Sequence, residues 1–122
     1  MKRRILVVED EEPLRLLYEE ELREEGYEVL TACNGKGALV QLEVGNPDLV
    51  ILDIIMPVMD GMEALGRILG KNRKIPIILN ISYSHYKEDF MSWAADAYVI
   101  KSSDLIELKE KIREFLEKGE SR

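Results

Sequence analysis

The sequence predicts a three-layer α/β domain in which helices cover both faces of a parallel β-sheet. Short apolar runs alternate along the chain with stretches whose apolar residues recur at helical spacing. Parallel strands need crossover connections, and these are usually helices packed on the faces of the sheet. At 122 residues the chain fits one domain.

Five apolar runs are expected to be strands because they are short, nearly continuous and bounded by polar or turn residues. They cover residues 4–8, 27–32, 49–52, 75–79 and 97–100. Pro76 falls near the start of the fourth run, where a missing backbone donor disturbs a ladder least.

The first helix is expected to begin near Pro13, which suits a first helical turn, and to stop at Gly26. Four apolar side chains recur on its inner face: Leu14, Leu17, Tyr18 and Leu22. Residues 34–37, NGKG, are turn-like, and a short amphipathic helix is expected to start at Ala38 and to finish near Gly45.

Three further helices complete the alternation. Asp60 is expected to cap the third, the fourth is expected over residues 84–95, and Asp104 is expected to cap the fifth. The inner face of the fifth helix holds Leu105, Leu108, Ile112 and Phe115. The domain is thus expected to span residues 1–118, with 119–122 as a polar tail.

Composition excludes several classes of function. A single cysteine and a single histidine exclude a disulfide framework and a Cys/His zinc site, so a metal would need oxygen ligands. The net charge of -7 argues against direct nucleic-acid binding by this domain. No apolar run approaches the ~18 residues of a membrane span, and the start of the chain lacks a signal-peptide pattern, so a cytoplasmic location is expected.

Charged side chains follow the predicted strands at the points where they end. Glu9 and Asp10 follow the first strand, Asp53 ends the third, residues 80–82 follow the fourth and Lys101 follows the fifth. In parallel sheets these ends lie along one edge, where ligands bind. Three carboxylates gathered there repel one another, and a hard cation such as Mg²⁺ together with a lysine relieves that repulsion.

Each of these residues also has a purely structural interpretation when taken singly. Glu9 and Asp10 suit the solvated start of a helix, Asp53 suits a cap, and Lys101 suits an exposed surface. Their joint placement at successive strand ends favours a functional site.

Four motifs resemble, in order and spacing, the receiver domain of bacterial two-component response regulators of the chemotaxis-regulator kind. They are ILVVEDEEPLR, LVILDIIMPVMDGMEAL, IPIIL and AYVIK, and they extend over essentially the whole chain. The resemblance implies a flavodoxin-like fold with strand order 2-1-3-4-5. It also implies that Asp53 accepts a phosphoryl group from a sensor histidine kinase. Such a domain is a signalling module that catalyses only its own phosphorylation and dephosphorylation.

Position by position, the resemblance implies a complete Mg²⁺ site. Asp10 and Asp53 would be direct ligands, Glu9 a ligand through water, and the backbone carbonyl of Ile55 a further ligand. Lys101 would hold a phosphoryl oxygen.

The switch residues depart from the pattern of the family. Relatives usually carry threonine or serine where this chain has Ile81, which cannot form a hydrogen bond through its side chain. Ser82 is expected to take over that role, with Asn80 and Ser84 as alternatives. Tyr98 matches the aromatic position that turns inward on activation in relatives.

Two more expectations come from the loops. Ser102 replaces the usual proline after the lysine, so we expect a trans bond there. Bulky Ile55 and Tyr83 flank the expected path of the attacking water, which predicts a long-lived phosphoaspartate.

The fourth helix, fifth strand and fifth helix form the face that relatives use for downstream proteins or an output domain. Its aromatic residues, Tyr83, Tyr86, Phe90 and Trp93, belong either to the core or to an interface, which includes a homodimer interface. The chain suits a single-domain regulator or the receiver of a longer protein. A pseudo-receiver that binds partners without phosphorylation is an alternative, and a small Mg²⁺-dependent phosphatase is another, although no P-loop supports it.

Overall fold

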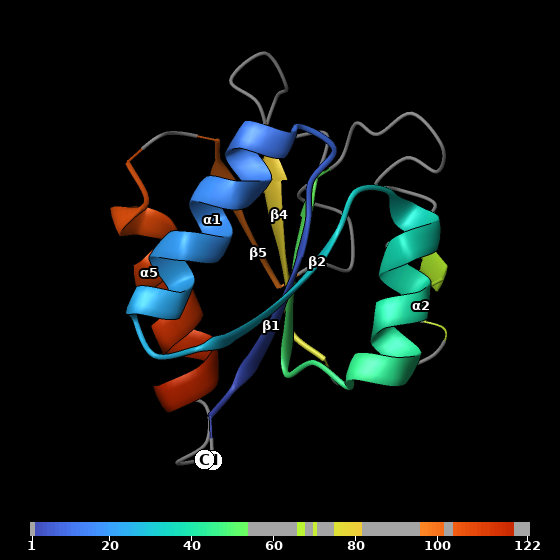
Figure 1. Ribbon diagram of the computed structural model, residues 1–122. Coiled ribbons are helices and arrows are strands. Elements are labelled where there is room, and N and C mark those ends of the chain that lie inside the picture. Colours follow the sequence, from blue (N-terminus) through green and yellow to red (C-terminus); the bar gives the residue numbers. More distant parts are fainter. Residues whose placement is uncertain are drawn as a thin grey trace.

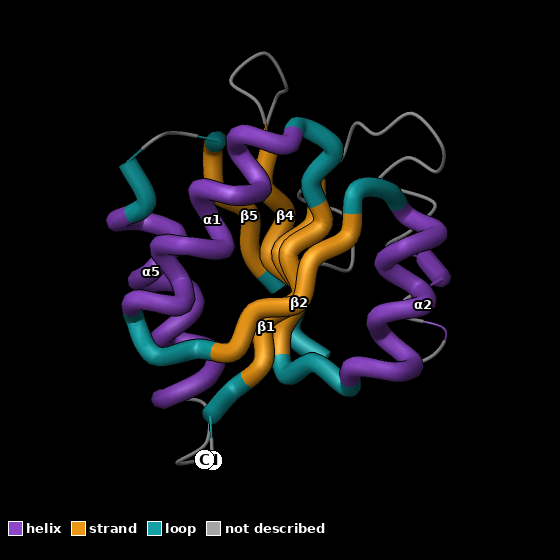
Figure 2. The backbone as a smooth tube through the Cα atoms, viewed as in Figure 1, coloured by secondary structure: helices purple, strands orange, loops and turns teal. Residues whose placement is uncertain are grey.

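The computed structural model describes residues 2–53, 66–67, 70, 75–81, 96–101 and 104–118. Within them a central sheet has helices α1 and α5 on one side and α2 on the other (Figure 1). The backbone trace shows the same three layers, with the strands twisted across one another in the middle (Figure 2). The predicted three-layer α/β architecture is confirmed.

All four neighbouring strand pairs of the sheet are parallel, and the strand order is β2-β1-β3-β4-β5. The strands are β1 (Arg4–Val8), β2 (Glu28–Ala32), β3 (Leu49–Asp53), β4 (Ile77–Ile81) and β5 (Ala97–Ile100). This is the flavodoxin-like order that the sequence resemblance implied.

The fourth strand begins two residues later than predicted. The register pairs Val50 with Ile77 and Asp53 with Asn80, so the strand runs on to Ile81. Pro76 precedes it, and its carbonyl accepts a hydrogen bond from the Val50 amide. The prediction used the apolar run alone and therefore included Ile75, which is buried but precedes the strand.

The described helices are α1 (Glu12–Glu24), α2 (Gly35–Gly45) and α5 (Ile106–Arg113), with a π-helical turn over Glu114–Lys118 continuing α5. Among the described residues, none of the helices has the length and apolar character needed to cross a membrane. The predicted helix over residues 84–95, and most of the one expected after Asp60, lie outside the described residues.

The assignment of NGKG as a turn was wrong, because α2 already begins at Gly35. Asn34 is the N-cap, and its side-chain oxygen accepts a hydrogen bond from the Gly37 amide at 2.8 Å. Asp104 also differs from expectation. Leu105 is the N-cap of α5, and Asp104, one residue earlier, accepts a hydrogen bond from the Ile106 amide at 3.0 Å.

Two apolar clusters fill the spaces between the layers. The cluster beneath α1 and α5 includes Ile5, Val7, Tyr18, Leu22, Ile51, Ile78, Leu108 and Ile112. The cluster beneath α2 includes Leu6, Val8, Ala38, Val50, Leu52, Ile77 and Leu79. Because strand side chains alternate between faces, odd-numbered residues of β1 and β3 join the first cluster and even-numbered ones join the second.

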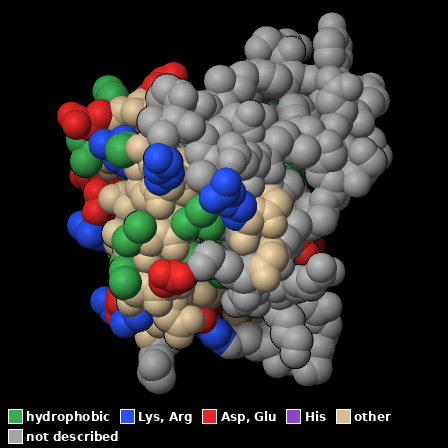
Figure 3. Space-filling model, turned by 90° about the vertical axis from the view of Figure 1, so that its right-hand side faces the viewer, with side chains coloured by type: hydrophobic (Ala, Val, Ile, Leu, Met, Phe, Trp, Pro, Cys, Tyr) green, Lys and Arg blue, Asp and Glu red, His purple; other side chains and the backbone are tan. Residues whose placement is uncertain are grey.

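The outer side of α2 is mixed in character. Figure 3 faces the side of the molecule that carries α2, where hydrophobic side chains lie exposed among acidic and basic ones. α2 contributes Val40 and Val44 to its surface, 57% and 74% exposed. Its last residue, Gly45, lies so close to β2 that an added Cβ would stand 2.3 Å from a methyl carbon of Leu30.

Candidate functional site

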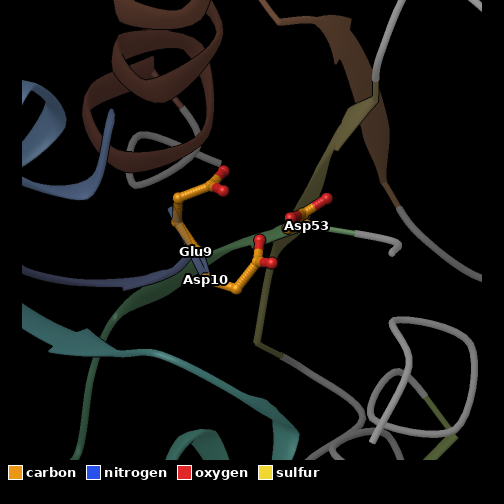
Figure 4. Close-up of side chains that lie close together, drawn as sticks. All are labelled: Glu9, Asp10 and Asp53. Atoms are coloured by element: carbon orange, nitrogen blue, oxygen red, sulfur yellow. The ribbon is translucent and has the colours of Figure 1, made fainter. Parts of the chain in front are cut away.

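Three carboxylates meet at the carboxyl ends of β1 and β3. Glu9 and Asp10 directly follow β1, and Asp53 is the last residue of β3. One oxygen from each carboxylate lies within 4.8 Å of the others. Figure 4 shows the three side chains projecting from neighbouring strand ends, with the carboxylates of Asp10 and Asp53 close together. The predicted convergence of these residues is therefore observed.

The alternation of β1 and β3 explains why two of the three carboxylates are buried. Glu9 continues the series of Ile5 and Val7, and Asp53 continues that of Ile51, so both fall on the face covered by α1 and α5. They are 1% and 4% exposed. Asp10 falls on the other side of the strand end and is exposed.

Lys101 supplies the positive charge of the site. It directly follows β5, and its Nζ lies 3.1 Å from an oxygen of Glu9 and 3.1 Å from Oδ2 of Asp53. The side chain is only 18% exposed, so solvent screens these pairs less than ordinary surface ion pairs. Lys101 thus joins the carboxylates as predicted.

The crowding of charge shifts the proton affinities of the site. Burial, followed by the repulsion of Asp53, raises the pKa of Glu9 to about 7, although the Glu11 amide and Lys101 oppose this. Burial alone would lower the pKa of Lys101, but the neighbouring carboxylates outweigh it and raise that pKa above 10.5. Lys101 therefore stays charged at neutral pH.

The donor set fits Mg²⁺. When all three carboxylates are ionised, they exceed the single ammonium by two negative charges, which a divalent cation neutralises. Carboxylate oxygens are the ligands that this hard ion prefers. The described residues that could hold it are Glu9, Asp10 and Asp53.

Arg15 holds the backbone of the acidic loop and was not singled out in the sequence. Its Nη1 donates to the carbonyl of Glu9 at 2.9 Å, and the carbonyl of Asp10 lies 3.5 Å away. The amide of Glu9 donates to the carbonyl of Ala32 at 3.0 Å. A basic residue one helical turn after an acidic strand end was the signal that could have identified this contact.

Tyr18 and Asn80 form a second feature that the sequence did not predict. Asn80 was considered only as a substitute switch residue, but Nδ2 of its amide donates to the hydroxyl of Tyr18 at 2.8 Å. An asparagine within an apolar strand, facing a tyrosine on the inner side of a helix, was the available signal.

Of the remaining predicted site residues, the structure describes Ile81 and Tyr98. Ile81 is the last residue of β4, and its backbone pairs with Ile100. Tyr98 is partly buried in β5 and packs against the cluster beneath α2. The other predicted loop residues lie outside the described part of the chain: Ile55, Ser82, Tyr83, Ser84 and Ser102.

Comparisons with known proteins agree with this architecture. The response regulator protein TrrA from Thermotoga maritima, solved in complex with Mg²⁺-BeF, is 54% identical, with a TM-score of 0.87 over 93% of this chain and 99% of that one. TrrA in complex with the histidine kinase ThkA matches with a TM-score of 0.85, over 93% of this chain and 98% of that one. A CheY-like response regulator receiver domain protein from Methanospirillum hungatei is 30% identical, with a TM-score of 0.90 over 99% and 98% of the two chains.

The curated relatives add a difference in length. The alkaline phosphatase synthesis transcriptional regulatory protein PhoP of Bacillus subtilis is 31% identical over 98% of this chain but 51% of its own length. The chain spans about half the length of PhoP and of several other curated relatives that it matches. Residues 5–113 match the response regulator receiver domain family. With that match and the acidic cluster at the predicted strand ends, this chain belongs to the receiver domain family of two-component response regulators.

Proposed function

We propose that this chain is a phosphoacceptor domain in which Asp53 takes a phosphoryl group from a sensor histidine kinase in a Mg²⁺-dependent reaction. One observation carries the proposal: the Asp53 carboxylate lies with those of Glu9 and Asp10 and 3.1 Å from Lys101 Nζ. The family match and the Mg²⁺-BeF complex of TrrA support it.

The proposed Mg²⁺ site uses Asp10 and Asp53 as direct ligands and Glu9 as a ligand through water. The backbone carbonyl of Ile55 completes the protein ligands, on the basis of the family resemblance. Bound Mg²⁺ supplies charge neutralisation for the oxygens of the transferring phosphoryl group. Asp10 is the exposed member of the set, so it lies on the side from which a donor approaches.

In the proposed transfer, a carboxylate oxygen of Asp53 attacks the phosphorus of the donor phosphohistidine. The new bond joins that oxygen to phosphorus, and the bond between phosphorus and the donor imidazole nitrogen breaks. Lys101 then holds a phosphoryl oxygen and offsets the charge that gathers there. Lys101 suits this role because its raised pKa keeps the ammonium protonated.

Loss of the phosphoryl group follows the same geometry in reverse. The oxygen of water bonds to phosphorus, the bond between phosphorus and the Asp53 oxygen breaks, and inorganic phosphate and a proton leave to solvent. In this proposal the domain catalyses only its own phosphorylation and dephosphorylation. We propose a long-lived phosphoaspartate, because the family resemblance predicts that the bulky residues Ile55 and Tyr83 flank the path of that water.

Switching in this chain is proposed to be atypical. Ile81 offers no side-chain hydroxyl, so Ser82 takes the role of the usual threonine or serine, and Tyr98 serves as the aromatic switch residue. Asn80 is less suited to replace that hydroxyl, because its amide is already hydrogen-bonded to Tyr18.

The proposed upstream partner is a sensor histidine kinase, supported by the complex of TrrA with ThkA. The proposed downstream face comprises the fourth helix, β5 and α5. A hollow of about 380 Å³ supports this face; Val99, Ile100 and Ile106 are among its lining residues, and Ile106 is 63% exposed. The match covers 98% of this chain but 51% of the length of PhoP, and this suits a receiver that is joined to an output domain.

The proposed domain spans residues 1–118, followed by the polar tail 119–122. The helical run that ends at Lys118 supports this boundary.

Intact-mass measurement after incubation with acetyl phosphate and Mg²⁺ tests the proposal. The unsubstituted chain should gain the mass of one phosphoryl group, and Asp53→Asn should gain none. Asp48→Asn is a matched control, because Asp48 lies at the opposite end of β3 and an amide oxygen can still accept from the Arg4 amide. This control should gain the phosphoryl group as the unsubstituted chain does.

The same experiment separates the alternatives. Turnover of many free phosphoesters without a stable adduct would support the phosphatase. Absence of any mass gain, with both acetyl phosphate and a phosphorylated kinase, would support the pseudo-receiver and contradict the proposal.

A further inference from the structure

A buried polar pair lies directly beside the acidic site. Asn80 of β4 and Tyr18 of α1 are 2% and 1% exposed, and the Asn80 Nδ2 to Tyr18 hydroxyl distance is 2.8 Å. The two residues are 62 positions apart in the sequence. This bond therefore ties the middle of α1 to the carboxyl end of β4.

The register of the sheet places this pair next to the proposed phosphoacceptor. Asn80 is the Cα partner of Asp53 in the parallel β3–β4 ladder, so their side chains lie side by side on one face. That face also holds Glu9, and Tyr18 packs onto it from α1. Asn80 is thus the buried neighbour of Asp53 on the side away from β1.

Packing alone does not account for a polar pair at this depth. The described cluster around Tyr18 is largely aliphatic, with Leu22 and Ile78 among its members, and Tyr27 is its other buried tyrosine. Burying an amide and a hydroxyl requires that each find a partner, and an apolar pair of similar size avoids this requirement. Burial raises the pKa of Tyr18 above its ordinary 10.0, so the hydroxyl stays protonated and can both accept and donate.

We propose that Tyr18 and Asn80 form a positioning pair that holds the Asp53 carboxylate in its reactive orientation. This inference rests on the proposed phosphoryl transfer to Asp53 and adds two residues to it. Neither residue touches the transferring group. Tyr18 acts by fixing the amide of Asn80, and Asn80 acts by fixing the end of β4 against the end of β3.

The physical reason is that an in-line attack depends steeply on the placement of the nucleophile. Asp53 lies at the carboxyl end of β3 as described, where Asn80 is its Cα partner in β4. Asn80 lies opposite it, and the bond to Tyr18 prevents the amide from turning toward the charges of the site. Without that bond, the amide competes for the oxygens of Asp53.

Tyr18→Phe is the sharpest test, because it removes one hydroxyl and leaves every charge of the site in place. Tyr27→Phe is the matched control. Tyr27 directly precedes β2, is 9% exposed and belongs to the same apolar cluster. Its hydroxyl donates a hydrogen bond to the Glu117 carboxylate at 2.9 Å. Both variants lose one tyrosine hydrogen bond of similar length, but only one of these bonds adjoins Asp53.

The measurements are the rate constant of phosphorylation by acetyl phosphate at saturating Mg²⁺ and the Mg²⁺ affinity by calorimetry, on chains shown to be folded by circular dichroism. Tyr18→Phe should slow phosphorylation by about tenfold, while Mg²⁺ affinity changes by less than about threefold because all three carboxylates remain. Tyr27→Phe should leave the rate within about twofold. Asn80→Leu should be slowed like Tyr18→Phe, and the double variant should be no slower than the slower single one.

A Tyr18→Phe rate within about twofold of the unsubstituted chain would overturn the inference, as would equal slowing in Tyr18→Phe and Tyr27→Phe. If Asn80→Leu does not fold, the comparison of Tyr18→Phe with Tyr27→Phe decides alone. No phosphorylation of the unsubstituted chain would instead overturn the proposed function, and this inference with it.

Discussion

The two faces of the sheet differ in what their strands bury. Beneath α2 the buried cluster is wholly apolar, with Leu6, Val50 and Leu52 among its members. Beneath α1 and α5 the same strands bury Glu9 and Asp53 at their carboxyl ends. In the described part of the chain, the buried polar side chains, Asn80 included, all belong to that second face.

This difference follows from the period of two in a strand. Glu9 and Asp53 each have buried apolar residues two and four positions earlier on the same face, so the site extends the core rather than interrupting it. The consequence is that α1 and α5 lie over the charges, while α2 packs on a neutral layer. The contribution of the face beneath α1 and α5 to stability should therefore depend on pH and on bound metal. The contribution of the face beneath α2 should depend only on the apolar volume that it buries.

The largest expected effect is on the neutral face. Leu52→Ala should lower the free energy of unfolding by about 2–5 kcal/mol, because Leu52 is fully buried and the substitution leaves a cavity. The loss should be the same near pH 5 and near pH 8, since the described buried residues that pack with Leu52 beneath α2 are all apolar. Urea unfolding followed by circular dichroism measures it. A loss that differs by more than about 1 kcal/mol between these pH values would contradict the contrast between the faces.

A smaller effect is expected from Glu9 on the charged face. Its pKa is about 7 in the folded chain against an ordinary value of 4.5, so the folded state binds this proton more tightly than the unfolded state does. The stabilisation from Glu9 is present below pH 4.5 and is lost as pH rises to about 7. In metal-free protein near pH 8, Glu9→Gln should therefore raise the free energy of unfolding by about 2 kcal/mol, and near pH 5 it should change it little.

Glu28→Gln is the control for this pH dependence. Glu28 is paired with Arg4 at 3.0 Å, but its side chain is about half exposed. Glu28→Gln should therefore change the free energy of unfolding by less than about 1 kcal/mol, and this change should not vary with pH near neutrality. If the free energy of unfolding depends on pH in the same way in Glu9→Gln and in the unsubstituted chain, the ionisation of buried Glu9 does not destabilise the fold, and the prediction is wrong.

The smallest effect concerns Mg²⁺ itself. Near pH 8, Mg²⁺ at ten times its dissociation constant should stabilise the chain by about 1.4 kcal/mol. Near pH 5 the gain should be smaller, because Glu9 must first lose a proton. Thermal unfolding with and without Mg²⁺ measures both. If Mg²⁺ stabilises Asp53→Asn as much as it stabilises the unsubstituted chain, the ion does not bind at Asp53.

Much of this arrangement could be predicted from the sequence, because the strands are continuous apolar runs that end in charge. The bounds of β1 and β5 were predicted to the residue, and the meeting of Glu9, Asp10, Asp53 and Lys101 followed from the parallel sheet. Strand ends in such a sheet share one edge, so spacing along the chain becomes proximity in space.

The parts that were missed depend on partners distant in the sequence. The start of β4 is set by pairing with Val50, which an apolar run does not reveal. The first turn of α2 is a local exception: its two glycines suggested a turn, and the side chain of Asn34 caps it by accepting a hydrogen bond from the Gly37 amide. The bond between Tyr18 and Asn80 joins two elements whose relative placement no local pattern gives.

The hydrogen bonds from Arg15 to the backbone at Glu9 and Asp10 have a use in protein design. The guanidinium holds the carbonyls of Glu9 and Asp10, so these contacts do not require a particular side chain at Asp10, whereas the Glu9 carboxylate also accepts a hydrogen bond from the Glu11 amide at 3.1 Å. The ligand chemistry at Asp10 can therefore be exchanged, for instance toward softer donors and other cations, while Arg15 still holds the backbone carbonyls of Glu9 and Asp10.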